Sequence, residues 1–189
     1  MITIGILGGI GSGKSHIAKF FGYPVFNADL EVSKLYKNDR KIFNRLKKNL
    51  SKHIYTFPIN KNEISEAILA NKSNLKKIVK IVHFEIRKKM NKFLSKNKNK
   101  KIVILDIPLL LENKINNKKD ILVFVDSKKS DILKKLKERK NFNKHIYKRF
   151  NDIQLPLDYK KRKSQFIVKN NFTNKPVKSA IRDILKRII

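Results

Sequence analysis

The sequence predicts an α/β fold with a doubly wound parallel sheet of about five strands. Short apolar runs of strand length alternate along the chain with stretches whose apolar residues recur at helical spacing. The first run, 2–7, leads directly into a glycine-rich segment and then into a helix-like one. The runs at 101–108 and 121–126 are almost continuously apolar, as strands covered on both faces are. In such a fold, ligands bind at the carboxyl ends of the strands.

The first half of the chain alternates strand-like with helix-like patterns. Strand 2–7 precedes a helix that begins near His16, and a short strand at 25–26 ends in the polar sequence Asn27-Ala28-Asp29. Helical stretches are expected over 29–50, 60–71 and 75–94, the last with the clearest amphipathic pattern.

The second half repeats this alternation and ends in a helix. The expected order is strand 101–108, strand 121–126, helix 130–140, a densely charged segment over 139–165, a short strand 166–168 and an amphipathic helix from 177 to 188. We interpret residues 1–189 as a single domain, with a helical acceptor-binding region at about 30–94 and a basic lid at about 139–165.

The most informative motif lies at residues 8–15, which match the phosphate-loop pattern G-x-x-x-x-G-K-[ST] at every position. Glycines let the backbone approach phosphates closely, and successive N–H groups with the start of the next helix form an anion site. Lys14 supplies a mobile positive charge, and the Ser15 hydroxyl is a ligand for Mg²⁺. The motif predicts a nucleoside triphosphate site at Gly9, Gly11, Ser12, Gly13, Lys14 and Ser15.

The formal net charge is +31, from 46 Lys and Arg against 15 Asp and Glu. The lysines recur through most of the chain, and no nucleic-acid-binding module is recognisable, so we do not expect nucleic acid to be the main partner. The same positive field would raise the local concentration of a polyanionic small substrate.

Several protein classes are excluded by composition. The chain has no cysteine, which excludes disulfides and thiolate metal sites. We find no signal peptide and no run approaching the roughly 20 apolar residues of a membrane span. We therefore expect a cytoplasmic protein without a membrane partner.

A phosphate loop by itself does not separate kinases from GTPases, ATPases and motors. No Asn-Lys-x-Asp motif for reading guanine follows the later strands, and the chain is short for a motor. Small size, an acid after the second strand and a late basic segment favour a kinase of small metabolites.

Motifs along the chain resemble, in order, those of the dephospho-CoA kinase family. The segment 7–15 resembles TGGIGSGKS, 27–29 resembles D-A-D, 82–83 resembles L-H-P, 106–112 resembles D-I-P-L-L-F-E, Gln154-Leu155-Pro156 with Lys160 resembles Q-M-P…K, and 166–170 resembles F-V-I-D-N. The resemblance covers nearly the whole chain. It implies a kinase that uses ATP and Mg²⁺ to phosphorylate the ribose 3′-hydroxyl of dephospho-CoA, the last step of coenzyme A biosynthesis.

The resemblance and the chemistry of phosphoryl transfer together assign roles to further residues. Asp29, at the end of a strand expected beside the phosphate-loop strand, is the candidate base or orienter of the acceptor hydroxyl, with a helix N-cap as the alternative reading. Arg139, where the family's lid begins, is expected to reach the transferring phosphoryl group and to act with Lys14. Asp106 is expected to hold a metal-bound water beside Ser15. His16 and Asn170 are expected to contact an inner phosphate and the adenine.

Some positions depart from the family pattern: Leu7, His16, Asn27, Phe84 and Gln165 replace Thr, Thr, Asp, Pro and Asp, respectively. Arg149 and Lys160 are weaker lid candidates, and His83 lies near the apolar stripe of its helix. Two other functions stay open: a different small-molecule kinase, such as a nucleoside monophosphate kinase, and a basic RNA-associated P-loop protein.

Overall fold

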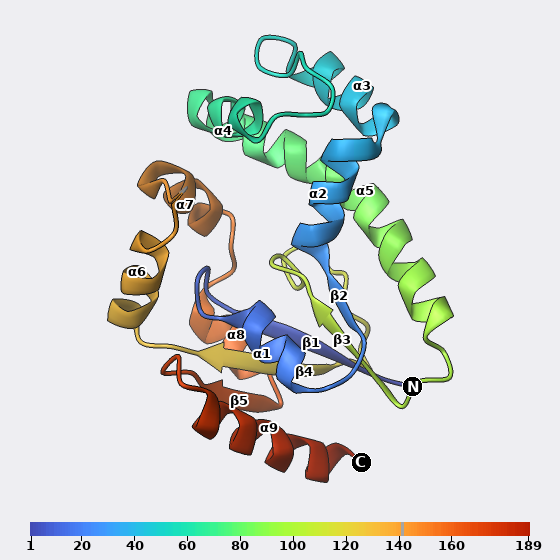
Figure 1. The fold of residues 1–189 in the computed structure, drawn as a ribbon, viewed down its shortest axis with the longest axis vertical. Coiled ribbons are helices and arrows are strands. Elements are labelled where there is room, and N and C mark those ends of the chain that lie inside the picture. Colours follow the sequence, from blue (N-terminus) through green and yellow to red (C-terminus); the bar gives the residue numbers. More distant parts are fainter. Residues whose placement is uncertain (141) are drawn as a thin grey trace. The chain divides into compact units, whose positions relative to one another are not determined.

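The computed structural model describes residues 1–140 and 142–189. Within them, five parallel strands form one sheet in the order β2-β3-β1-β4-β5, with β1 at its centre (Figure 1). The strands are β1 (Ile2–Gly8), β2 (Val25–Asn27), β3 (Ile102–Asp106), β4 (Ile121–Asp126) and β5 (Phe166–Lys169). The predicted fold class is confirmed.

The position of β2 corrects one expectation. The sequence interpretation places the strand before Asp29 beside the phosphate-loop strand, but β3 lies between them. Residues 2–5 of β1 pair with 102–105 of β3, and Val25–Asn27 pair with the same strand from its other side. Parallel neighbours are joined by long crossover connections, so the order of strands along the chain does not give their order in the sheet.

Alternate residues of the central strands form a core on one face of the sheet. Helices α1 (Lys14–Phe20) and α9 (Asn174–Ile188) cover this face (Figure 1). The strands contribute Ile4, Ile6, Ile102, Ile104, Val123, Val125 and Val168, and the helices contribute Ile17, Ala18, Val177, Ile181 and Ile184. Apolar residues at every second strand position thus pack against apolar residues spaced three or four apart in the helices. Together they form one apolar layer that supports the phosphate loop.

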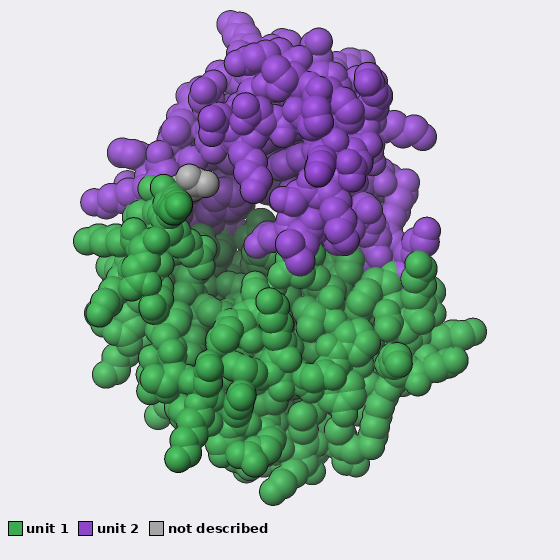
Figure 2. Space-filling model, in the orientation of Figure 1, with its two compact units in different colours: residues 1–27, 93–142, 154–189 green, residues 28–92, 143–153 purple. Residues whose placement is uncertain are grey.

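The chain divides into two compact units, coloured separately in Figure 2. The first, which we call the sheet unit, consists of 1–27, 93–142 and 154–189. This unit contains the five-stranded sheet and four helices: α1, α6 (Lys129–Lys137), α8 (Leu157–Lys163) and α9. The second, the helical unit, consists of 28–92 and 143–153.

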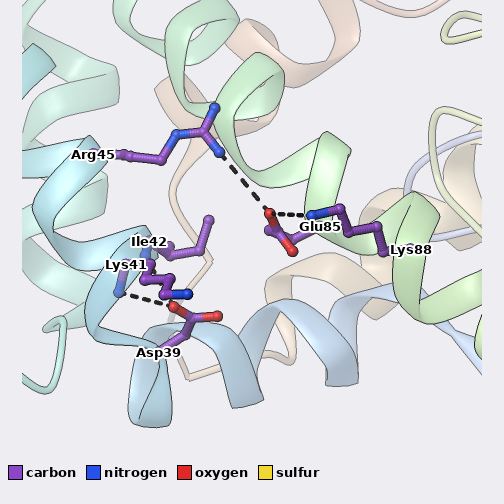
Figure 3. Close-up of polar contacts among 6 residues, drawn as sticks. All are labelled: Asp39, Lys41, Ile42, Arg45, Glu85 and Lys88. Atoms are coloured by element: carbon purple, nitrogen blue, oxygen red, sulfur yellow. Dashed lines mark hydrogen bonds and ion pairs between the residues drawn. The ribbon is translucent and has the colours of Figure 1, made fainter.

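The helical unit contains α2 (Ala28–Asn38), α3 (Arg40–Asn49), α4 (Lys61–Ala70), most of α5 (Lys72–Lys96), and α7 (Lys144–Asp152). The stretch expected to be helical over 29–50 is broken at Asp39, whose carboxylate accepts hydrogen bonds from the N–H groups of Lys41 and Ile42 at 2.9 and 3.0 Å. This is an N-cap, so Asp39 starts a new helix (Figure 3).

Helices α3 and α5 are joined by surface charges. Glu85 lies 4.0 Å from Arg45 of α3 and 3.5 Å from Lys88 of its own helix (Figure 3). Because these side chains are substantially exposed, the pairs add little to stability.

The segment proposed as a lid contains two helices that hydrophobic periodicity did not indicate. Asn143 caps α7 by accepting from the N–H groups of His145 and Ile146, and Pro156 precedes α8. Residues 143–153 belong to the helical unit, whereas 154–165 belong to the sheet unit. The N-cap Asn143 and the helix-starting Pro156 were the available sequence signals for these helices.

Candidate active site

The phosphate loop joins β1 to α1 at the carboxyl edge of the sheet. Gly11 and Gly13 have φ angles of 81° and 89°, in the left-handed region that glycine adopts without steric cost. A Cβ on Gly11 would also lie 2.9 Å from the Leu136 side chain. The glycines predicted to let the backbone turn closely are therefore required here by both conformation and space.

Lys14 lies over its own loop. Its ammonium donates hydrogen bonds to the carbonyl oxygens of Gly8 and Gly9, at 3.2 and 2.7 Å. Ser15 follows in the first turn of α1 and is exposed. A mobile cation and an accessible hydroxyl therefore stand at the N-terminal end of a helix, where backbone N–H groups favour anions.

Asp106 ends β3 and is 3% exposed. Its direct neighbour across the sheet is Asn27, the last residue of β2, and the Asn27 amide donates to the Asp106 carboxylate at 2.6 Å. Sequence reasoning identified Asp106 but missed this partner. The departure at position 27 now has a physical reading, because an aspartate there would set two carboxylates against each other.

Asp29 and Arg139 are both exposed. Asp29 lies in the first turn of α2, where a carboxylate interacts favourably with the helix N-terminus. It belongs to the helical unit, while Arg139 follows α6 in the sheet unit. The structure thus gathers the phosphate loop, Asp106 and Arg139 in one unit and places Asp29 in the other.

His16 and Asn170 both interact with other parts of the sheet unit. The His16 ring lies 3.0 Å from the Asn174 side-chain oxygen and stacks edge-on against Phe20. Asn170 follows β5, and its side-chain amide donates to the carbonyl oxygen of Ser12 at 2.8 Å. The contacts predicted for these residues with an inner phosphate and with adenine stay predictions.

Comparison with known proteins decides the family. A family model described as dephospho-CoA kinase matches residues 2–175 of this chain. The chain belongs to the dephospho-CoA kinase family. The resemblance inferred from its motifs is confirmed, and with it the expectation of a kinase that uses ATP.

Individual relatives agree with this assignment. The dephospho-CoA kinase of Wolbachia sp. subsp. Brugia malayi (strain TRS) is 34% identical over 189 residues, covering 97% of this chain and 96% of the relative. That of Bartonella henselae is 32% identical, covering 89% of this chain and 88% of its own length. Membership of the dephospho-CoA kinase family therefore extends over nearly the whole chain.

Solved structures show the same fold at lower identity. The crystal structure of TT1252 from Thermus thermophilus has a TM-score of 0.79 at 22% identity and covers 100% of this chain and 98% of that one. Dephospho-CoA kinase from Campylobacter jejuni has a TM-score of 0.63 at 20% identity, covering 98% and 96%. Shikimate kinase from Acinetobacter baumannii has a TM-score of 0.55 at 12% identity, covering 100% and 93%. The fold is therefore shared with kinases of different acceptors.

Two of the family motifs meet in a buried ion pair. The Lys160 ammonium lies 2.5 Å from a Glu112 carboxylate oxygen, and the two side chains are 1% and 8% exposed. Lys160 also donates to Gln154 at 3.1 Å, and the same Glu112 oxygen accepts from the Leu155 N–H at 3.0 Å. Lys160, one of the two weaker lid candidates, is therefore buried within the sheet unit, where its ammonium contacts both Glu112 and Gln154.

His83 lies on α5 in the helical unit, and its Nε2 atom is buried without a hydrogen-bond partner in the described residues. Burial and then the neighbouring Arg87 lower the pKa of the ring, so the neutral form is favoured. A neutral imidazole with an unused ring nitrogen can donate or accept one hydrogen bond.

Two kinds of feature are absent from residues 1–140 and 142–189. No helix there is both long and apolar enough to cross a bilayer, and no three or more His, Cys, Asp or Glu side chains are grouped as metal ligands.

Proposed function

We propose that this chain transfers the γ-phosphoryl group of ATP to the ribose 3′-hydroxyl of dephospho-CoA, producing coenzyme A and ADP. The phosphate loop at the carboxyl edge of the sheet, in a chain matched by the family over residues 2–175, supports the proposal best. Phosphoryl transfer requires positioning and charge neutralisation more than covalent chemistry, and a preformed anion site provides both.

In this proposal the loop backbone from Gly11 to Lys14 holds the β-phosphate, within the nucleotide site that runs from Gly9 to Ser15. Lys14 exchanges the carbonyls of Gly8 and Gly9 for β- and γ-phosphate oxygens. His16 follows the loop and contacts an inner phosphate. The positive electrostatic field that results from the net charge of +31 draws the polyanionic substrates toward the protein.

Mg²⁺ suits the oxygen ligands at this edge of the sheet unit. Ser15 and Asp106 would hold it, directly or through water, because Mg²⁺ keeps several waters and binds few protein ligands alongside substrate phosphates. The Asn27 amide orients the Asp106 carboxylate for this purpose. When bound, Mg²⁺ would neutralise charge on the phosphates.

Asp29 accepts the proton of the acceptor hydroxyl or fixes its direction, and Arg139 stabilises the charge spread over the transferring group. The planar guanidinium of Arg139 can pair with two phosphoryl oxygens through two parallel N–H donors held in a fixed fork, a geometry that a lysine ammonium lacks. Asn170 is proposed to lie close to the adenine.

The acceptor is tested by ADP release from Mg-ATP with dephospho-CoA, AMP, CMP or no acceptor at near-physiological salt. We expect release well above background with dephospho-CoA alone. If ADP were released with AMP or CMP instead, the fold assignment would stand, but the acceptor would be a nucleoside monophosphate. Absence of any acceptor-dependent rate, together with salt-sensitive RNA binding, would favour the RNA-associated alternative.

A second prediction concerns the proposed lid. None of the side chains of α7 is buried, and the helix carries Lys144, Lys148 and Arg149, so it is weakly held and repels other cations. Helix α8 is anchored by the buried Lys160. We expect saturating Mg-ATP to slow amide hydrogen exchange in α7 and to change it little in α8. Unchanged exchange in α7 would contradict a lid role for this helix.

A further inference from the structure

The carbonyl oxygen of Ser12, in the middle of the phosphate loop, accepts two hydrogen bonds from outside the loop. The Asn170 side-chain amide donates at 2.8 Å, and the Ser127 hydroxyl donates at 3.0 Å. Ser127 directly follows β4 and Asn170 directly follows β5. The ends of two neighbouring strands thus hold one peptide group of the loop.

Asn170 is itself rigidly held. It is 4% exposed, its side-chain oxygen accepts from the Phe172 N–H at 2.9 Å, and its own N–H donates to the Asp126 carbonyl at 2.7 Å. A buried amide bonded at both ends of its side chain has one orientation. It is therefore a fixed point from which the loop can be positioned.

The direction of this contact determines what it does to the loop. In a planar trans peptide, the Ser12 carbonyl and the Gly13 N–H point in opposite directions. Holding the carbonyl on the Asn170 side turns the Gly13 N–H to the other side of the loop. Asn170 also fills the space beside Gly13, since a Cβ there would lie 2.5 Å from the Asn170 nitrogen.

We propose that Asn170 is a positioning residue for the phosphate loop, with Ser127 as its second donor. By holding the Ser12 carbonyl it keeps the loop peptide in the orientation that presents N–H groups to the nucleotide phosphates. The inference rests on the proposed nucleotide site and deepens it, because it assigns the contribution of Asn170 to phosphate binding through the loop backbone. Preorganised backbone donors bind an anion without the cost of ordering them during binding.

The test compares ATP with inorganic tripolyphosphate, which has the phosphates but no adenine. Asn170→Asp keeps the side-chain shape and the acceptor for Phe172, but it sets an oxygen against the Ser12 carbonyl. We expect the dissociation constants of Mg-ATP and of tripolyphosphate, measured by calorimetry, to rise together by about tenfold or more. We also expect KM for ATP to rise while KM for dephospho-CoA stays unchanged.

Two further variants complete the test. Ser127→Ala removes the second donor and should weaken the binding of Mg-ATP and of tripolyphosphate by the same factor, smaller than that for Asn170→Asp. This variant keeps the test valid even if Asn170→Asp fails to fold. Asn171→Ala is the matched control. Within residues 1–140 and 142–189, the side chain of this neighbouring exposed asparagine accepts hydrogen bonds from Thr173, and its loss should leave both constants unchanged.

The outcomes separate the inference from the proposed function. Weaker ATP binding with unchanged tripolyphosphate binding would overturn the inference and favour direct contact with adenine. Unchanged binding of both ligands in Asn170→Asp and Ser127→Ala would also overturn it, as would an equal loss in Asn171→Ala. If the unaltered protein bound neither ligand, the nucleotide site itself would be refuted.

Discussion

Replacing Asp29 by asparagine is expected to reduce turnover by about 10²- to 10⁴-fold. Asparagine keeps the size and the hydrogen-bonding oxygen of the side chain but cannot accept a proton from the acceptor hydroxyl. In the proposed mechanism Asp29 acts on the acceptor hydroxyl, and the phosphate loop holds the nucleotide. The dissociation constant of Mg-ATP should therefore stay near its original value, and steady-state kinetics with nucleotide-binding calorimetry would measure both quantities.

Asp39→Asn is a suitable control for this experiment. Asp39 is another acidic residue of the helical unit, and its carboxylate caps α3. Asparagine caps helices about as well as aspartate, so this variant should keep its turnover. If Asp29→Asn retained turnover, Asp29 would be removed from the mechanism, and if it lost ATP binding, its role would lie in the nucleotide site.

What the sequence could predict depended on how local each feature is. The phosphate loop is contiguous, so the strand, glycines, lysine and helix of residues 2–20 could be recognised from their order along the chain. The buried strand 102–106 was equally clear from its continuous apolar pattern. Here the local pattern and the fold agree.

Features that depend on distant residues could not be predicted in the same way. Asn27 meets Asp106 only because β2 pairs with β3, and that pairing cannot be read from either segment alone. Asn170 contacts Ser12 from a position 158 residues away. Lys160 is buried, whereas Lys161 and Lys163 of the same lysine-rich helix are not. The burial of Lys160 therefore depends on tertiary packing and not on the local composition of the helix.

Breaking the buried pair between Lys160 and Glu112 is expected to have the largest effect on stability. Lys160→Met leaves the Glu112 carboxylate buried with the Leu155 N–H as its remaining donor among the bonds described above. Loss of one partner of a buried pair costs about 3–5 kcal/mol, because the other charge loses its compensation. Urea unfolding should show this decrease in the free energy of unfolding.

The neighbouring Lys161 provides the matched control. It lies 2.8 Å from Asp126, but both side chains are more than a third exposed. Water solvates each charge when the other is removed, so Lys161→Met should change stability far less than Lys160→Met. Equal effects of the two variants would show that burial does not govern the Lys160 contribution.

The double variant Lys160→Met/Glu112→Leu then separates the cost of an uncompensated charge from the value of the pair itself. Apolar side chains of similar volume often replace a buried ion pair at little or no cost, so we expect the double variant to recover much of the stability lost in Lys160→Met. The pair also anchors the start of α8, where Leu157 lies 3.6 Å from the position a Cβ would take on Gly9. If the double variant is stable but binds Mg-ATP more weakly, the ion pair contributes more to the geometry of the phosphate loop than to the stability of the fold.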